Sequence, residues 1–229
     1  MATTIETFRD RSAVMDHCAD DRALACVTAR EGDTELGSVT LLDLGAEDTD
    51  LRIVALLEAT TATVTPLMRE AARVAREAGG TVLRWVAETD EVTPRALAEL
   101  GAAEGDEVYR WWQLDLPAAR VRATGPAVRE LPAQDGDTFR LGLNDAVFDV
   151  EVHDGTATLA HDREQEGTVA ELTELLSAVV NKVRGEHPAA RLAEAHADAR
   201  DDTLHAALRT LGFAPTERRA VEYHLALRA

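Results

Sequence analysis

The stretch TVAELTELLSAVVNKVRGEHPAARLAEAHADARDDTLHAALRTLGF, residues 168–213, decides the fold. Its first part predicts an amphipathic helix, because apolar residues recur at intervals of three and four along one face. These residues are Leu172, Leu175, Leu176, Val179, Val180 and Val183. Thr168 and Glu171 have the spacing of a capping box at the helix start. Gly185 and Pro188 mark its end.

The remainder of this stretch predicts a strand over residues 191–199, a short helix over 202–210, a Leu-Gly-Phe turn, and a final strand that ends at Leu227. Strand alternation separates two faces of the 191–199 strand. The polar face carries Leu192, Glu194, His196 and Asp198, and the other face carries only alanines. The alanine face can pack closely beneath a helix.

Composition restricts the function. The 229 residues are 45% hydrophobic, which is enough for one large domain or two small ones. The net charge of −18 argues against nucleic acid or membrane partners and favours a cationic or neutral small molecule, unless the charge serves solubility alone. Cys18 and Cys26 form no CxxC motif, so we expect no metal site and no disulfide framework. The N-terminus has no apolar signal segment, so we expect a cytoplasmic protein.

The same order of elements occurs twice. In the first half we expect strands at 3–8, 23–30, 35–42, 51–57, 81–88 and 108–116, with helices at 11–17, from Thr65-Pro66 to Gly79-Gly80, and from Thr93-Pro94 to Leu100. In the second half, strands at 138–143, 147–153 and 156–161 precede the helix at Thr168. Residues 117–136 are rich in Pro, Ala, Arg and Gly and predict a linker. The expected domains are therefore residues 1–116 and 137–229, a duplication with a period of about 110 residues.

This arrangement resembles the second half of a GNAT-type N-acetyltransferase, present twice. The resemblance rests on an antiparallel meander, a long helix, a strand, a short helix, Leu211-Gly212-Phe213 and an aromatic closing strand. It covers residues 51–116 and 156–227, and the tandem layout is similar to that of two-domain acetyltransferases such as mycothiol synthase. It implies an α/β (α+β) fold of two GNAT-like halves, each with a mainly antiparallel mixed sheet flanked by helices.

The resemblance also implies acetyl-CoA or another acyl-CoA as cofactor. In this family the pyrophosphate lies at the start of the long helix, on a loop of the form Gln/Arg-x-x-Gly-x-Gly/Ala, where backbone N–H groups and the helix dipole favour an anion. The second copy of the loop assigns this role to Gly167, Thr168 and Val169. It also carries two carboxylates, at 164 and 166, that oppose an anion. The first copy, residues 59–64, has no glycine.

A general acid for the leaving thiolate is the other requirement of the family. It is often a tyrosine in the short helix before Leu-Gly-Phe. The corresponding residues are Leu97 and Leu208, which are both apolar. Another residue or a water molecule would have to supply this proton.

Candidate catalytic residues lie on two predicted strands. In this family the 191–199 strand runs beside the cleft where acyl donor and amine meet. We therefore expect His196 to accept a proton from an amine, while Glu194 or Asp198 holds the cation. Glu151 and His153, on the polar face of the 147–153 strand, are second candidates. The alternative is that both polar faces are simply solvated.

The two tryptophans of the first closing strand have a structural and a functional interpretation. Trp111 and Trp112 follow Tyr109, so one indole enters the core and the other lies outside, either as plain surface or as a stacking platform for a flat ligand.

Three function classes follow. The first is a divergent acyltransferase that moves an acyl group from acyl-CoA to an amine-bearing small molecule. The second is a non-catalytic small-molecule binding protein, for self-resistance or sequestration, that has lost CoA binding. The third uses the duplicated fold for oligomerisation, such as a homodimer. Fold class does not choose among them.

Overall fold

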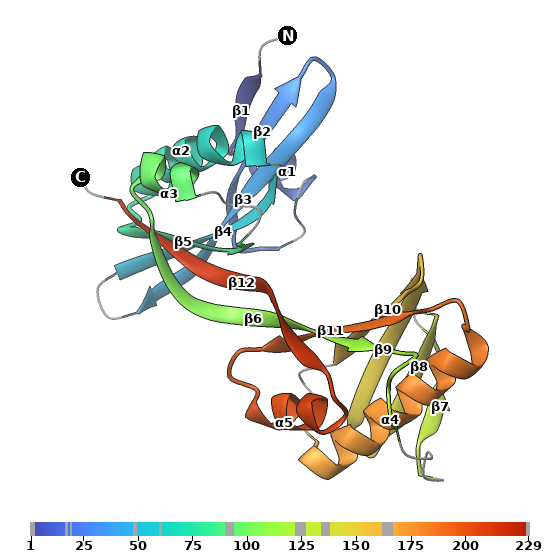
Figure 1. Ribbon diagram of the computed structural model, residues 1–229. Coiled ribbons are helices and arrows are strands. Elements are labelled where there is room, and N and C mark those ends of the chain that lie inside the picture. Colours follow the sequence, from blue (N-terminus) through green and yellow to red (C-terminus); the bar gives the residue numbers. More distant parts are fainter. Residues whose placement is uncertain are drawn as a thin grey trace. The chain divides into compact units, whose positions relative to one another are not determined.

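The computed structural model describes residues 3–16, 18, 20–47, 50–59, 61–89, 94–121, 127–133, 138–161 and 167–227. They form two compact units. Unit 1 contains Met1–Val108 together with Ala220–Ala229, and unit 2 contains Tyr109–Arg219. Each unit is a mixed sheet flanked by helices, so the predicted α/β fold class is confirmed (Figure 1).

Unit 1 has a sheet in the order β1-β2-β3-β4-β5-β12. Its elements are β1 (Thr4–Phe8), α1 (Arg11–Met15), β2 (Ala23–Glu31), β3 (Thr34–Glu47), β4 (Asp50–Ala59), α2 (Thr61–Glu77), β5 (Val82–Glu88), α3 (Pro94–Leu100) and the second part of β12 (Ala214–Ala226). Among the described strands of unit 1, β4 and β5 are the parallel pair, and α2 is the crossover between them. The core of unit 1 lies between this sheet and α2.

Unit 2 has a sheet in the order β7-β8-β9-β10-β11-β6. Its elements are the second part of β6 (Ala103–Asp115), β7 (Arg129–Leu131), β8 (Phe139–Leu143), β9 (Ala146–His153), β10 (Thr156–His161), α4 (Val169–Glu186), β11 (Leu192–Asp198) and α5 (Asp202–Thr210). Here β10 and β11 are the parallel pair among the described strands, and a long helix connects them. The two units therefore repeat one plan, as the sequence predicts.

The closing strands are exchanged between the two halves of the sequence. Residues 220–226 of β12 pair with β5 in unit 1, and residues 109–115 of β6 pair with β11 in unit 2. The sequence matches these two strands to each other but does not reveal that each completes the sheet of the other half. The expected domain boundaries, 1–116 and 137–229, stay a prediction. β7 lies within the stretch that was expected to be a linker.

The helix α4 is confirmed as predicted. Thr168 is its N-cap, and every residue of the apolar stripe is at most 1% exposed. α4 and α5 cover one face of the unit 2 sheet (Figure 1) and contact each other. The alanines at 193, 195 and 197 lie beneath them, also at most 1% exposed. Small side chains on the central strand allow this close packing of helix on sheet.

The predicted start of α2 is wrong. The helix begins at Thr61 rather than after Thr65, so that Pro66 lies inside it. Burial explains the extension, because the added turn places Val64 in the core at 0% exposure and Thr63 at 4%. Proline removes one helical hydrogen bond, but the burial of an apolar side chain is worth about 1.5–3 kcal/mol and offsets that loss.

Among the residues that the structure describes, none of the helices combines the length and the apolar character needed to span a bilayer.

Candidate functional site

The two parallel strands of unit 2 stay paired over only part of their length. Their register runs from Thr156 opposite Leu192 to Leu159 opposite Ala195. Both strands continue past this last row, β10 to His161 and β11 to Asp198. The end of β11 that carries His196 therefore lies where the parallel pairing has stopped. The ends of parallel strands that stop pairing are a natural place for a ligand in such a sheet.

The face of the unit 2 sheet opposite α4 and α5 carries a cluster of polar and aromatic side chains. His196 lies between the rings of Tyr109 and Trp111, with ring centroids 6.1 and 6.2 Å away. The β6–β11 register explains this contact, because His196 is directly opposite Trp111 and two residues from Tyr109. Trp112 points to the other face and is 2% exposed. The expectation of one core indole is confirmed by Trp112, whereas Trp111 on the other face is half-buried rather than exposed.

Glu194 is held by two partners on this face. The side-chain amide of Gln113 donates a hydrogen bond of 2.8 Å to its carboxylate, and a guanidinium nitrogen of Arg218 lies 3.8 Å away. The guanidinium of Arg218 also lies over the indole of Trp111, 4.3 Å from the ring centroid. A cation thus sits between a carboxylate and an aromatic face, which is an arrangement that recognises cations in general.

Asp198 is the last residue of β11, and its side chain stabilises the turn that follows. Its carboxylate accepts a 2.9 Å hydrogen bond from the backbone N–H of Arg200. It shares the polar face with Glu194 and His196, and all three are half-buried. The structure therefore brings the three predicted residues of this strand to one face. It also shows β11 to be central, between β10 and β6.

Glu151 and His153 lie farther along the same face. Thr158 of β10 is opposite Glu151 on one side and opposite Glu194 on the other. The two carboxylates are thus two strands apart, or about 10 Å. His153 is 78% exposed and lies 3.0 Å from the carboxylate of Asp154. The structure does not bring this histidine to His196.

The start of α4 is occupied by the chain's own carboxylate. The backbone N–H of Thr168 donates to Glu171 at 2.8 Å, and the N–H of Glu171 donates back to the Thr168 hydroxyl oxygen at 3.2 Å. The Thr168 hydroxyl and the side-chain amide of Asn144 also donate to the Glu171 carboxylate. The predicted capping box is confirmed, and it uses two of the N–H groups that a helix start otherwise offers to an anion.

Gly167 has an internal explanation. A Cβ at this position would lie 3.1 Å from a methyl of Leu172 and 3.2 Å from the Cβ of Ala146. A side chain here would need Leu172 and Ala146 to shift by a few tenths of an ångström, so packing against α4 and β9 favours glycine. Val169 follows with 39% exposure. The rest of the expected loop, residues 162–166, lies outside the described residues.

These observations test whether a CoA pyrophosphate fits the start of α4. The hydrogen bonds to Glu171, first the one from the Thr168 backbone, lower the pKa of this carboxyl below its usual value of 4.5. Glu171 is therefore ionised near neutral pH, and its negative charge lies where the phosphates would need to approach. As this turn stands, the described residues do not fit a pyrophosphate.

The residues at the family's tyrosine position belong to the core. Leu208 is 0% exposed, and Leu97 packs against the core of unit 1. Neither can transfer a proton. The sequence analysis did not identify Gln113 and Arg218 as part of the cluster. The alternation of Tyr109, Trp111 and Gln113 on one predicted strand was the available signal.

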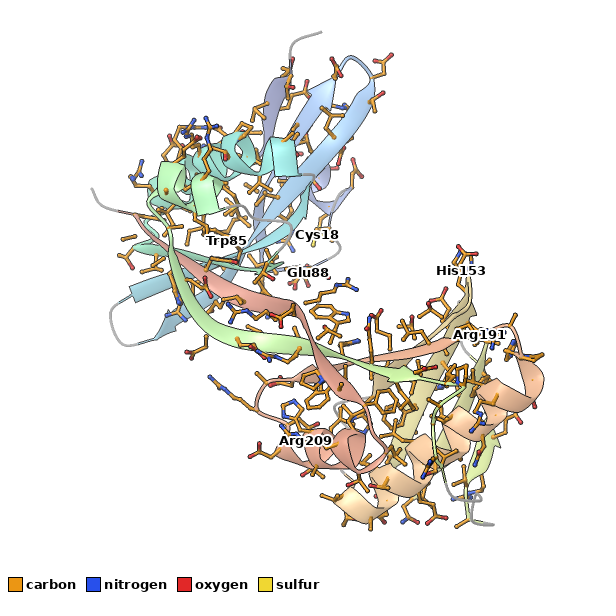
Figure 2. The ribbon with its side chains drawn as sticks, in the orientation of Figure 1. Cys18, Trp85, Glu88, His153, Arg191 and Arg209 are labelled. Carbon is orange, nitrogen blue, oxygen red and sulfur yellow. The ribbon has the colours of Figure 1, made fainter. Side chains whose placement is uncertain are left out.

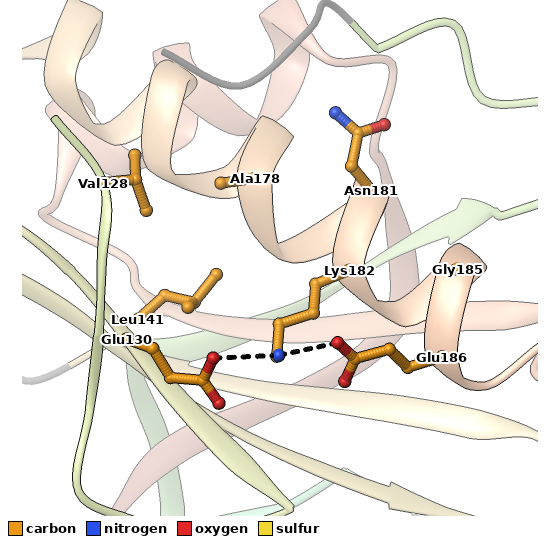
Figure 3. A pocket seen from close by; sticks show the side chains of 8 residues that line it. All are labelled: Val128, Glu130, Leu141, Ala178, Asn181, Lys182, Gly185 and Glu186. Carbon is orange, nitrogen blue, oxygen red and sulfur yellow. Dashed lines mark hydrogen bonds and ion pairs between the residues drawn. The ribbon is translucent and has the colours of Figure 1, made fainter. Parts of the chain in front are cut away.

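A separate pocket of about 460 Å³ lies at the other end of α4 (Figure 3). The ammonium of Lys182 lies between the carboxylates of Glu130 and Glu186, at 3.1 and 2.8 Å, and 5.2 Å from the ring centroid of Phe139. The carboxylate of Glu186 is the main cause that raises the pKa of Lys182. This ion pair ties the edge strand β7 to α4, which is a structural role.

The described part of the chain has no group of three or more His, Cys, Asp or Glu side chains arranged to hold a metal ion. Neither Cys18 nor Cys26 forms a disulfide bond. Figure 2 shows the side chains of the described residues, with Cys18, His153 and Arg209 among those labelled.

Comparison with known proteins identifies the fold. No protein-family model matches the sequence. No curated protein matches it either. Among solved structures, a tandem GNAT protein from the clavulanic acid biosynthesis pathway, solved without acetyl-CoA, is similar with a TM-score of 0.61 and 17% identity over 95% of this chain and 87% of that chain.

Two further structures agree with this assignment. A GCN5-related N-acetyltransferase from Anabaena variabilis has a TM-score of 0.55 and 7% identity, covering 98% of this chain and 73% of that chain. A probable N-acyltransferase of unknown function from Enterococcus faecalis has a TM-score of 0.54 and 6% identity, with 99% and 73% covered. The chain has the tandem GNAT fold, which confirms the resemblance of the sequence. At these identities the similarity defines the fold and not the activity.

Proposed function

We propose that this chain is a GNAT-fold acyltransferase that acts on an amine-bearing small molecule, bound on the polar face of the unit 2 sheet. The observation that carries the proposal is the position of Arg218. Its guanidinium lies over Trp111 and beside Glu194, which supports a site that holds a cation. A ligand cation would compete with Arg218, whose side chain is 44% exposed and able to move away.

The roles of the residues follow from the chemistry of amines. An amine attacks an acyl carbonyl only as the neutral base, so the bound ammonium must first lose a proton. We assign this proton to the imidazole of His196, which lies beside Trp111 where β10 and β11 are no longer paired. Glu194 holds the cation, and Asp198 lies on the same face of β11 as Glu194. His153 and Glu151 remain second candidates on β9.

Acyl-CoA is the donor that the fold family implies. The start of α4 does not favour its pyrophosphate, because the ionised Glu171 occupies that position. This observation favours a second candidate function, in which the chain binds the amine without transferring an acyl group. Calorimetric titration with acetyl-CoA and with desulfo-CoA separates the two candidates, since only acyl transfer from CoA requires that they bind.

Amine binding is tested with agmatine, which carries both an amine and a guanidinium, by following the fluorescence of Trp111. The Glu194→Gln variant should weaken binding at least tenfold. Glu151→Gln, two strands away on the same face, is the matched control and should change it less than twofold. Arg218→Ala should tighten binding, because the internal competitor is gone. Equal effects of the two glutamate variants would contradict the proposed site.

The proton transfer is tested separately. His196→Ala should flatten the dependence of acyl transfer to agmatine on pH between 5 and 8, while the dissociation constant of agmatine changes little. An unchanged pH profile would remove His196 from the mechanism.

A further inference from the structure

A pocket of about 410 Å³, here called the α5 pocket, lies at the C-terminal end of α5 within unit 2. Its larger apolar residues, Leu114 and Leu211, are at most 8% exposed. The charged residues that line it are Arg120, Arg209 and Asp115. A cavity of this volume is in the range of small-molecule sites.

The two arginines of the α5 pocket differ from many others in this acidic chain. Arg140, for example, lies beside the carboxylate of Asp149. Among the residues that the structure describes, none brings a carboxylate within ion-pair distance of Arg120 or Arg209, not even Asp115 in the same pocket. A guanidinium has five N–H donors and no acceptor. Both side chains therefore keep donors for an anionic ligand.

Contacts within the protein hold the walls of the α5 pocket in place. The guanidinium of Arg209, on the last turn of α5 (Figure 2), lies 5.2 Å from the ring centroid of Trp112. The segment before Arg120 is fixed by Arg184, which donates a hydrogen bond of 3.0 Å to the carbonyl oxygen of Ala119. A site that is ordered before its ligand arrives loses less entropy on binding.

The equivalent helix end in unit 1 shows that the repeated fold does not need this charge. Both α3 and α5 end before Leu-Gly or at its leucine, so Ala98 of α3 corresponds to Arg209 and Glu99 to Thr210. The described last turn of α3 has no basic residue, and Glu99 forms a 2.8 Å ion pair with Arg95. A cation at a helix C-terminus is favourable in general, yet α3 lacks one. The arginine of α5 is therefore a feature of the pocket and not of the shared plan.

We propose that the α5 pocket binds a small organic carboxylate with a short apolar body. The planar guanidinium fork matches the geometry of a carboxylate, and the apolar surface of Leu114 and Leu211 suits the body of the ligand. Two arginines and one aspartate leave the pocket with one net positive charge. This balance matches a singly charged carboxylate better than a phosphate monoester, which carries about −1.5 to −2.

The α5 pocket is separate from the amine site of the proposed function. Asp115 is opposite Leu192, the first residue of β11, whereas His196 is opposite Trp111. The two rows are four residues apart, or about 13 Å along the strand. Carboxylate binding therefore does not depend on the proposed reaction, and the two are tested separately.

The probe is hexanoate. Its controls are hexanamide, which has the same apolar chain without the charge, and acetate, which has the charge without the chain. The backbone amide signals of Arg120, Thr210 and Gly212 are followed by NMR in the full chain. We expect saturable shifts of these signals with hexanoate, shifts less than a fifth as large with hexanamide, and at least tenfold weaker binding of acetate. No saturable shift with hexanoate, equal shifts with hexanamide or equal affinity for acetate would overturn the proposal.

Charge variants provide the second test. Arg120→Gln and Arg209→Gln should each weaken hexanoate binding at least fivefold, and Asp115→Asn should tighten it, because a competing negative charge is removed. Arg129→Gln is the matched control, since it removes the same charge from an exposed residue of β7 outside the pocket, and it should change the affinity less than twofold. Arg120→Gln leaves the contact between Arg209 and Trp112 intact, so its effect does not depend on the packing of α5. Unchanged affinity in both pocket variants, an equal loss in the control, or weaker binding in Asp115→Asn would overturn the proposal.

Discussion

The starts of α2 and α4 occupy equivalent places in two units of the same strand order, yet they differ in charge. α4 begins with a capping box whose carboxylate, Glu171, accepts hydrogen bonds from the first turn. The first turn of α2, from Thr61, has no acidic residue. A helix start attracts anions through its N–H groups and dipole. Unit 2 satisfies that attraction with its own carboxylate, whereas the first turn of α2, as far as the structure describes it, carries none.

This difference shows that two units with the same fold can differ in the ligands that they accept. The parallel pair, the crossover helix and the closing strand are the same in both units. Whether a phosphate can approach depends on the side chains of a single turn. The glycine that made the second copy the better CoA candidate in the sequence is explained by its contacts with Leu172 and Ala146.

The largest expected effect tests whether the two units share one plan. A chain that ends at Arg219 lacks the strand that pairs with β5, and unit 1 loses Val221, Tyr223 and Leu227 from its core. Each buried side chain of this size contributes about 2 kcal/mol or more. We expect the amides of β5 to lose their protection from hydrogen exchange, while those of β11 retain it.

The matched control for this truncation is a chain that ends at Leu227, which should behave as the wild type. Retained protection of β5 in the chain ending at Arg219 would contradict the strand exchange. It would also remove the structural basis for comparing the two helix starts.

A smaller effect distinguishes the two helix starts directly. Thr168→Ala removes the hydroxyl that accepts from the N–H of Glu171 and should lower the free energy of unfolding by about 1 kcal/mol. Thr65→Ala is the matched variant in α2. Because Thr65 lies inside that helix, the substitution should cost no more than a few tenths of a kcal/mol. Urea denaturation measures the free energy of unfolding of both variants. A larger loss of stability in Thr65→Ala than in Thr168→Ala would support a start of α2 at Thr65, as the sequence predicted.

The smallest effect is the pH dependence of the cap. Hydrogen bonds from Thr168 lower the pKa of Glu171 in the folded state. A lowered folded pKa stabilises the protein above the unfolded value of 4.5, and this contribution is lost as the pH falls through the folded pKa. The stability gap between wild type and Glu171→Gln should therefore be widest near pH 7 and narrow as the pH falls below 4.5. A gap that does not change with pH would contradict the ionic role of the cap.

Much of the fold was predictable because the periodic signals are local. The stripe of α4, its capping box and the alternating faces of β11 all follow from residues within one or two turns of each other. The start of α2 was not predictable in this way. Its first turn is stabilised by the burial of Val64 against other elements. The local Thr65-Pro66 pattern instead favoured a helix that starts at Pro66.

The candidate site was predictable only in part. The polar stripe of Glu194, His196 and Asp198 follows from strand alternation. The partners of this stripe do not, because Gln113 and Arg218 come from strands 81 and 24 residues away in the sequence. The exchange of β6 and β12 could not be predicted from the sequence either. The residue pattern of a closing strand is the same whichever sheet the strand completes.

The most direct test of the account follows the backbone amides of both helix starts by NMR while inorganic pyrophosphate is added to the full chain. The account predicts that the amide signals of Thr168, Val169 and Ala170 do not shift in the wild type, because Glu171 occupies this position. A saturable shift of these three amides in the wild type would contradict it.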